Sequence, residues 1–153
     1  MAEALVVGFG SDLRGDDGAG RRVAELVESW GLVGVRVVSV HQLTPELAAD
    51  LAEVGRAVFV DADPSATRIA VSALEPEPAG DASSHHTGPA GLLHLARETF
   101  GHAPAAHLVT VPASDFTLGA PLSAATARAV PEAAAAVGAL LSTEPPTQGW
   151  GTR

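Results

Sequence analysis

The sequence predicts an α/β fold with three layers, in which helices cover both faces of a mostly parallel five-stranded sheet. Short apolar segments rich in β-branched residues alternate along the chain with longer segments that have helical periodicity. This alternation is typical of parallel sheets, because neighbouring parallel strands are usually joined by a helix. The length of 153 residues fits one domain, and no internal repeat divides the chain.

Five segments are expected to form the strands. Each is a short run of mainly apolar residues, and two of the runs are followed directly by Gly8 and Asp61. Runs of this length and composition are typical of strands that are buried on both faces. The five segments are Ala4–Val7, Val35–Val40, Ala57–Val60, Ile69–Leu74 and Ala106–Val111.

Four segments are expected to form helices. In Gly18–Trp30, apolar side chains recur at intervals of three and four residues, as on one face of an amphipathic helix. The second helix opens at Thr44-Pro45-Glu46, where threonine suits the cap and proline suits the first turn. The other two helices are expected at Gly91–Phe100 and Leu122–Leu141.

Proline and glycine mark the expected breaks. Pro131 is predicted to interrupt the last helix, because proline lacks the N–H that an internal helical residue donates. Two prolines and a glycine in the polar segment Glu75–His86 predict a surface loop. We expect a single domain over residues 1–141 and a flexible tail over residues 142–153.

The charge balance excludes one large class of function. The chain has 9 basic and 18 acidic residues, so its formal net charge is −9, and all the basic residues are arginines. Proteins that bind nucleic acid generally present a basic face to the phosphates. We therefore expect no nucleic-acid partner.

The absence of cysteine excludes disulfides, thiolate metal sites and a cysteine nucleophile. The first residues lack the basic and apolar regions of a signal peptide, and no run of about 18 apolar residues occurs. These features predict a cytoplasmic protein without a membrane span. Only four Phe and two Trp are present, and this scarcity of aromatic anchors favours a monomer.

Chemistry-bearing side chains follow several of the expected strands. Asp16 and Asp17 follow the first strand, Asp61 ends the third, and His85 lies in the long loop after the fourth. Ligands of open α/β sheets bind outside the carboxyl ends of the strands. Two carboxylates and one imidazole suit a divalent first-row metal and leave positions open for substrate or water.

Each of these residues also has an ordinary structural interpretation. Asp16 or Asp17 would serve equally well as a cap on the helix that follows. Asp61 precedes Ala62-Asp63-Pro64, a sequence typical of a turn, and a histidine in a loop is most often a solvated side chain. The same solvated role is expected for the other loop and surface histidines, His86, His94, His102 and His107. The functional hypothesis therefore depends on the combination.

Two other α/β binding sites fit less well. The segment from Gly8 to Leu13 begins like a dinucleotide-binding loop, but Leu13 stands in place of the third glycine and two carboxylates follow. The acidic pair and the run VFVDADP resemble a phosphoacceptor receiver domain. A receiver also needs a lysine after its fifth strand, and this chain has no lysine.

Three motifs in order resemble the maturation proteases of nickel–iron hydrogenases. They are VVGFGSDLRGDDGAG, VFVDA and SSHHTGPAGLL, and the resemblance extends from residue 4 to about residue 141. The first is similar to the family pattern G-x-G-N-x-L-x-x-D-[DE]-G-x-G. The resemblance implies an endopeptidase that removes the C-terminal extension of the hydrogenase large-subunit precursor after nickel insertion. The resemblance also implies that the nickel belongs to the precursor and that another divalent metal would be able to occupy the site in vitro.

The resemblance implies that Asp17, Asp61 and His85 contact the metal and share in catalysis. His85 is preferred to His86 because two serines precede it. Two positions depart from the family pattern, since Ser11 replaces the usual asparagine and His41 begins a segment where some members carry an aspartate. Whether His41 has a catalytic role or only lines the cleft stays open. The alternatives are a non-catalytic nickel-binding chaperone and a related peptidase with another substrate.

Overall fold

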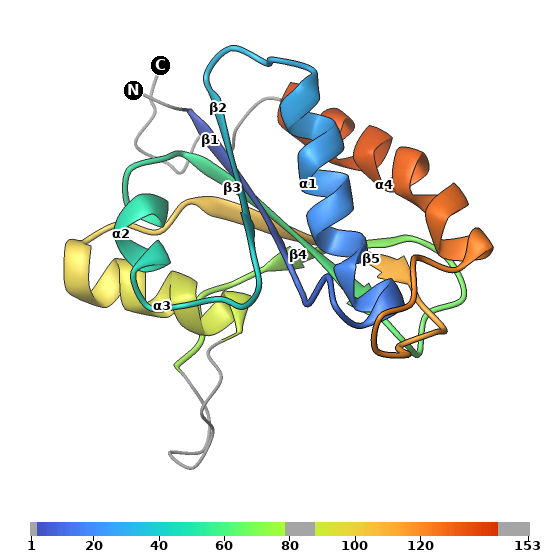
Figure 1. The fold of residues 1–153 in the computed structure, drawn as a ribbon. Coiled ribbons are helices and arrows are strands. Elements are labelled where there is room, and N and C mark those ends of the chain that lie inside the picture. Colours follow the sequence, from blue (N-terminus) through green and yellow to red (C-terminus); the bar gives the residue numbers. More distant parts are fainter. Residues whose placement is uncertain (1–2, 79–87, 144–153) are drawn as a thin grey trace.

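The fold is seen in a computed structural model, which describes residues 3–78 and 88–143 (Figure 1). Its sheet has five strands in the order β2-β1-β3-β5-β4. β1, β2, β3 and β5 run parallel, whereas the edge strand β4 is antiparallel to β5. The strands are β1 (Ala4–Phe9), β2 (Val35–Val40), β3 (Arg56–Asp63), β4 (Ala70–Leu74) and β5 (Ala105–Pro112). The predicted α/β class and mostly parallel sheet are confirmed.

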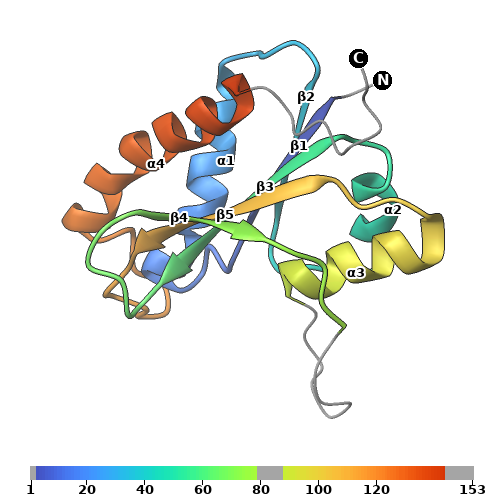
Figure 2. The same cartoon turned by 180° about the vertical axis from the view of Figure 1, so that it is seen from behind.

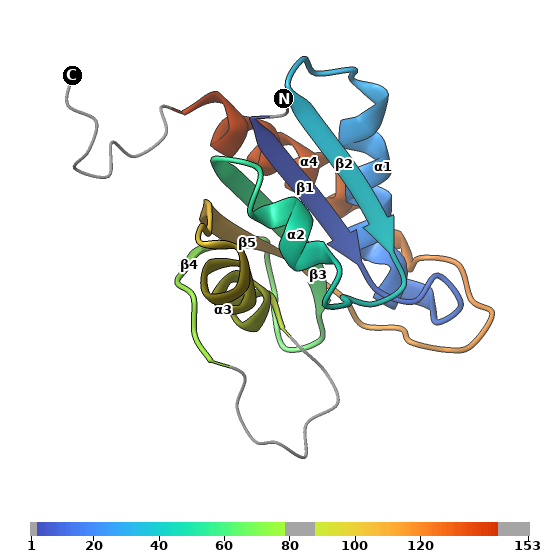
Figure 3. The same cartoon turned by 90° about the vertical axis from the view of Figure 1, so that its left-hand side faces the viewer.

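Helices cover both faces of this sheet, as Figures 2 and 3 show from two further directions. α1 (Ala19–Ser29) and α4 (Ala124–Ser142) lie together on one face. α2 (Leu47–Leu51) and α3 (Pro89–Phe100) lie on the other. Side chains of the central strands alternate between the two apolar cores, so that Val58 and Val60 face one and Ala57 and Phe59 face the other.

The helices differ from the sequence prediction at several points, and α3 and α4 begin at Pro89 and Ala124 instead of Gly91 and Leu122. α1 begins at Ala19, because Gly15–Gly18 form a separate 3-10 turn, η1. α2 is only five residues long, from Leu47 to Leu51. α4 runs through Pro131 without a break, so the predicted interruption is wrong. Pro131 is exposed, and the buried side chains around it, including Val130 and Ala133, hold the helix on the sheet despite the missing N–H.

The two segments predicted to lack regular structure are described only in part. Residues 75–78 of the expected loop form no helix or strand, and residues 79–87 lie outside the described part. Ser142, the first residue of the expected tail, is the last residue of α4, and residues 144–153 also lie outside it. None of the helices in the described ranges is long and apolar enough to cross a membrane.

Candidate functional site

A pocket of about 430 Å³ lies at the carboxyl edge of the three neighbouring parallel strands β2, β1 and β3. Asp17, Asp61 and His41, three of the residues singled out in the sequence, line it. Each comes from a different part of the chain, namely η1, the end of β3 and the connection after β2. The remaining lining residues are Phe9, Gly10, Ser11, Gln42, Leu43, Gly88 and Pro89.

The connection after β1 holds Asp17 at the edge of this pocket. Asp17 Oδ2 accepts a hydrogen bond of 2.8 Å from the backbone N–H of Ser11. Gly10 has φ of 141°, and a β-carbon there would stand 2.0 Å from the Asp17 carbonyl oxygen. A side chain at position 10 is therefore excluded both by backbone conformation and by space. The glycine allows the chain to fold back on itself and brings Asp17 beside Ser11.

The adjacent residues Asp16 and Asp17 face in different directions. Asp17 is partly exposed and lines the pocket, whereas Asp16 is completely buried. Asp16 accepts hydrogen bonds from the backbone N–H groups of Ser114, Asp115 and Ser123 and from the Ser123 hydroxyl. Burial alone would raise the pKa of Asp16, but these four bonds together hold its pKa well below the usual range. Asp16 is thus an ionised group of the interior.

Asp61 has the opposite electrostatic environment. Burial raises its pKa to about 6, a hydrogen bond from the Ala62 backbone N–H opposes that rise, and the charges of Asp17 and Asp63 add to it. A carboxyl group with such a pKa exchanges its proton close to neutral pH. The repulsion from Asp17 would be relieved if a cation bound between the two carboxylates. The site is therefore suited to bind a positive ion.

The structure brings together only part of the predicted ligand set. Asp17 and Asp61 line one pocket, but His85 lies outside the described residues. Within residues 3–78 and 88–143, no three acidic or histidine side chains come together as a metal-binding group. A shared metal role for Asp17, Asp61 and His85 stays a prediction. His41 is exposed at the rim of the pocket, between the ends of β2 and α2.

Histidines left out of the predicted site lie away from this pocket. His102 Nε2 is 2.8 Å from the carbonyl oxygen of Val54, near the opposite edge of the sheet. His94 is on α3 and His107 is on β5, and the Nδ1 atom of each is buried without a hydrogen-bond partner among the described residues. His86 is outside the described part of the chain. The described three do not line the pocket at the strand ends.

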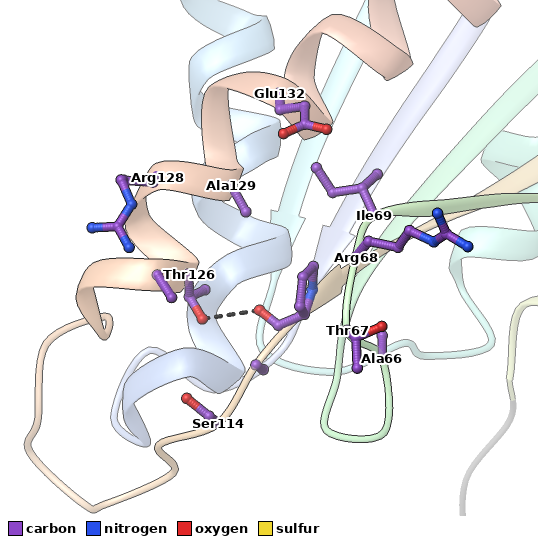
Figure 4. Close-up of a pocket in the computed structure, with 12 residues that line it drawn as sticks. Ala66, Thr67, Arg68, Ile69, Ser114, Thr126, Arg128, Ala129 and Glu132 are labelled. Carbon is purple, nitrogen blue, oxygen red and sulfur yellow. Dashed lines mark hydrogen bonds between the residues drawn. The ribbon is translucent and has the colours of Figure 1, made fainter.

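A second pocket, of about 500 Å³, opens between α4 and the connection from β3 to β4 (Figure 4). It contains Arg68, Arg128 and Glu132, but neither Asp17 nor Asp61. Figure 4 shows the two guanidinium groups on opposite sides of the view and directed away from each other. Charged groups therefore do not converge there, in contrast to the paired carboxylates of the first pocket.

The fold is shared with several solved structures along nearly the whole chain. The NiFe hydrogenase maturation protease HycI from Thermococcus kodakarensis is 21% identical, with a TM-score of 0.72 over 93% of this chain and 94% of its own. The maturating endopeptidase HybD from E. coli is 20% identical, with a TM-score of 0.72 over 91% of each chain. A hydrogenase 2 maturation peptidase from a Thaumarchaeota archaeon is 25% identical, with a TM-score of 0.70 over 93% of this chain and 99% of its own.

These similarities confirm at the level of the fold the resemblance seen in the sequence motifs. No protein-family model matches the sequence. No curated protein matches it at a significant level. At about 20% identity, the shared fold does not assign an activity, which has to be argued from the site itself.

Proposed function

We propose that this chain is an endopeptidase that removes the C-terminal extension of a nickel–iron hydrogenase large-subunit precursor after nickel insertion. Asp17, Asp61 and His85 would contact the nickel that the precursor carries, and His41 would line the cleft. The observation that carries the proposal is the pairing of Asp17 with Asp61 in one pocket, in a fold shared with hydrogenase maturation proteases.

The chemistry of the pocket supports this proposal. The Asp17 carboxylate contributes to the raised pKa of Asp61, and two acidic groups in one pocket favour the binding of a divalent cation. Gly88, three positions after His85 in the sequence, lines the same pocket, which is consistent with an imidazole as the third ligand. Nickel held in the precursor would polarise the scissile carbonyl or lower the pKa of an attacking water. The protein would supply the ligands that place the peptide bond beside it.

The direct test compares two forms of one precursor. The purified protein is incubated with the nickel-loaded precursor and, separately, with the nickel-free precursor, and the intact mass of each is followed. We expect loss of a C-terminal peptide from the loaded form alone. Cleavage of both forms would support the protease activity but exclude nickel as the recognition signal. Binding of the loaded form without cleavage would instead indicate a nickel-binding chaperone.

Single substitutions then assign the site residues. Asp17→Asn, Asp61→Asn and His85→Ala are expected to lower processing by about 10²-fold or more, because each removes a proposed ligand. Asp63→Asn is the matched control. It removes the same charge two positions from Asp61, but the Asp63 carboxylate bonds to Ser65 and does not line the pocket. Equal processing by all four variants and the wild type would contradict the assignment.

The proposed partner and location follow from the proposed reaction. A protease that acts on a precursor after nickel insertion has to meet it where it is assembled, so we propose a cytoplasmic protein. We also propose that it works as a monomer, because the chain has only four Phe and two Trp to anchor a subunit interface. Size-exclusion chromatography with light scattering, in the presence and absence of the precursor, tests the latter proposal.

A further inference from the structure

The completely buried carboxylate of Asp16 does not take part in the pocket, yet it is adjacent to Asp17. We infer that Asp16 is a positioning residue: it joins the connection after β1 to the loop before α4 and thereby holds Asp17 at the pocket. The effect on processing rests on the proposed function, whereas the effect on the position of Asp17 does not.

Both oxygens of Asp16 are used by the loop that precedes α4. Oδ2 accepts from the N–H groups of Ser114 and Asp115, at 2.8 and 3.0 Å, and from the Ser123 hydroxyl at 2.8 Å. Oδ1 accepts from the Ser123 N–H at 2.6 Å. Hydrogen bonds to an ionised acceptor are stronger than those between neutral groups, and loss of a buried one leaves its donor unsatisfied.

Backbone contacts tie the same two segments together. The Asp16 N–H donates to the Asp115 carbonyl oxygen at 2.7 Å, and the Gly119 N–H donates to the Leu13 carbonyl oxygen at 2.7 Å. Gly15 has φ of 51°, and a β-carbon there would stand 2.3 Å from the Asp115 carbonyl oxygen. In Figures 1 and 3 the two connections lie at the same end of the molecule. They form one unit with Asp16 at its centre.

A simple capping role does not account for this arrangement. A capping carboxylate accepts from backbone N–H groups in the first turn of the helix that it precedes. The N-cap of α1 is Gly18, with no side-chain cap, and the hydrogen-bond donors to Asp16 are 98 to 107 positions away in the sequence. The carboxylate therefore fixes a long-range contact.

The contact of Asp16 with the loop before α4 also determines the position of Asp17. Asp16 and Asp17 are consecutive residues of the single 3-10 turn η1, so a shift of one backbone unit moves the other. The observable sign of the correct position is the 2.8 Å hydrogen bond from the Ser11 N–H to Asp17 Oδ2. This bond involves neither metal nor precursor, and it can be followed in the protein alone.

The test compares Asp16→Asn with Asp12→Asn. Asparagine keeps the size of Asp16 but turns an amide NH₂ toward at least one of the donors that now meet a carboxylate oxygen. Asp12→Asn removes the same charge from the same connection, at an exposed residue that pairs with Arg21. Amide hydrogen exchange and the chemical shift of the Ser11 N–H are measured for both variants and the wild type by NMR.

In Asp16→Asn, we expect the Ser11 N–H to lose its hydrogen-bonded shift and to exchange at least tenfold faster, while amides of the central strands keep their protection. In Asp12→Asn, the Ser11 N–H stays as in the wild type. In a processing assay, Asp16→Asn lowers kcat about 10²-fold with little change in KM, because precursor binds but the ligand is misplaced. Asp12→Asn changes kcat less than twofold.

Three outcomes decide the inference. A folded Asp16→Asn protein with a normal Ser11 N–H and normal kcat would overturn it, even if the variant melts at a lower temperature. If the wild type does not process any precursor, the proposed function fails, and the Ser11 N–H still decides the role of Asp16. If Asp16→Asn does not fold, Ser123→Ala replaces it, since this variant removes the hydroxyl donor to Asp16 and keeps the three backbone N–H donors. It also removes the N-cap acceptor of the Thr126 N–H, so the Thr126 amide is followed alongside that of Ser11. A smaller change in the same direction supports the inference, and no change overturns it.

Discussion

Gly20 lies directly against the backbone of Val60. A β-carbon at position 20 would stand 2.3 Å from the Val60 carbonyl oxygen, so no side chain fits there. Asp17 precedes this glycine by three residues, and Asp61 directly follows Val60. The close approach of α1 to β3 therefore fixes how near the two carboxylates of the pocket lie to each other. Glycine at position 20 is a requirement of the site as well as of the helix packing.

Gly20→Ala is expected to lower the free energy of unfolding by about 1–3 kcal/mol, because the methyl group forces α1 away from β3. The same shift separates Asp17 from Asp61 and lowers processing. Urea denaturation and the precursor assay measure the two effects. Gly55→Ala is the control, since its β-carbon would meet only the Glu3 carbonyl oxygen, at 3.9 Å. Equal stability of both variants would contradict the close packing.

Asp61→Asn is expected to stabilise the folded protein at neutral pH. In the unfolded chain an aspartate ionises near pH 3.9, whereas burial raises the pKa of Asp61 in the folded protein to about 6. Between these values the folded state holds the proton more tightly, so stability falls as pH rises from about 4 to 6. Removing the charge raises the free energy of unfolding by about 2 kcal/mol above pH 6, after allowance for partial exposure of Asp61.

Urea denaturation of Asp61→Asn and the wild type from pH 4 to pH 8 tests this expectation. The difference between the two proteins should be small near pH 4 and reach its full size above pH 6. Asp63→Asn is expected to lower the free energy of unfolding at neutral pH, the opposite of Asp61→Asn. The reason is that hydrogen bonds from the Ser65 hydroxyl and N–H hold the pKa of Asp63 below its ordinary value. A stability difference that does not change with pH would refute the raised pKa of Asp61.

The sequence predicted the sheet well because its strands carry local signals. Apolar runs such as Val35–Val40 coincide with the strand as observed, and the order of strands and helices determines the parallel topology. Pro131 was misleading, since its local penalty is smaller than the gain from packing the apolar face of α4. Tertiary packing decided the length of that helix.

The candidate site was predictable only where short local motifs carry its residues, one motif for Asp17 and another for Asp61. Asp61 lies near the carboxyl end of β3 and Asp17 lies in the connection after β1, and the topology brings such positions to one edge. No pattern in the sequence indicated that Asp16 bonds to Ser114 and Ser123, because these partners are about 100 residues away. Their backbone N–H groups are donors that every residue except proline possesses, so no residue type marks them.

Arg56→Met is expected to destabilise the protein by about 1–3 kcal/mol. Arg56 is buried at the amino end of β3, and its guanidinium donates to the carbonyl oxygens of Leu140 and Thr143 at the end of α4. The Leu140 carbonyl oxygen also accepts from the Thr143 hydroxyl, so loss of Arg56 removes a charged donor from both carbonyl oxygens without stripping Leu140 of every partner. Urea denaturation measures the change in free energy.

The exposed ion pair of Arg36 with Asp50 provides the control for this arginine. Arg36→Met removes the same charge from the neighbouring part of the sheet, but the pair is accessible to solvent on both sides. Such pairs contribute about 0–1 kcal/mol. Equal destabilisation by Arg36→Met and Arg56→Met would mean that the net charge, and not the contact with α4, determines the effect.

Pro131→Ala is expected to stabilise the protein by about 1–3 kcal/mol. Pro131 lies inside α4 and is exposed, so alanine adds a helical N–H without losing buried contacts. Thermal denaturation should show a higher Tm, with unchanged processing because Pro131 does not line the pocket of Asp17 and Asp61. Pro121→Ala, in the loop before α4, is the control and should leave Tm equal or slightly lower, since it only frees the unfolded chain. A lower Tm for Pro131→Ala would mean that α4 depends on this proline for its path across the sheet.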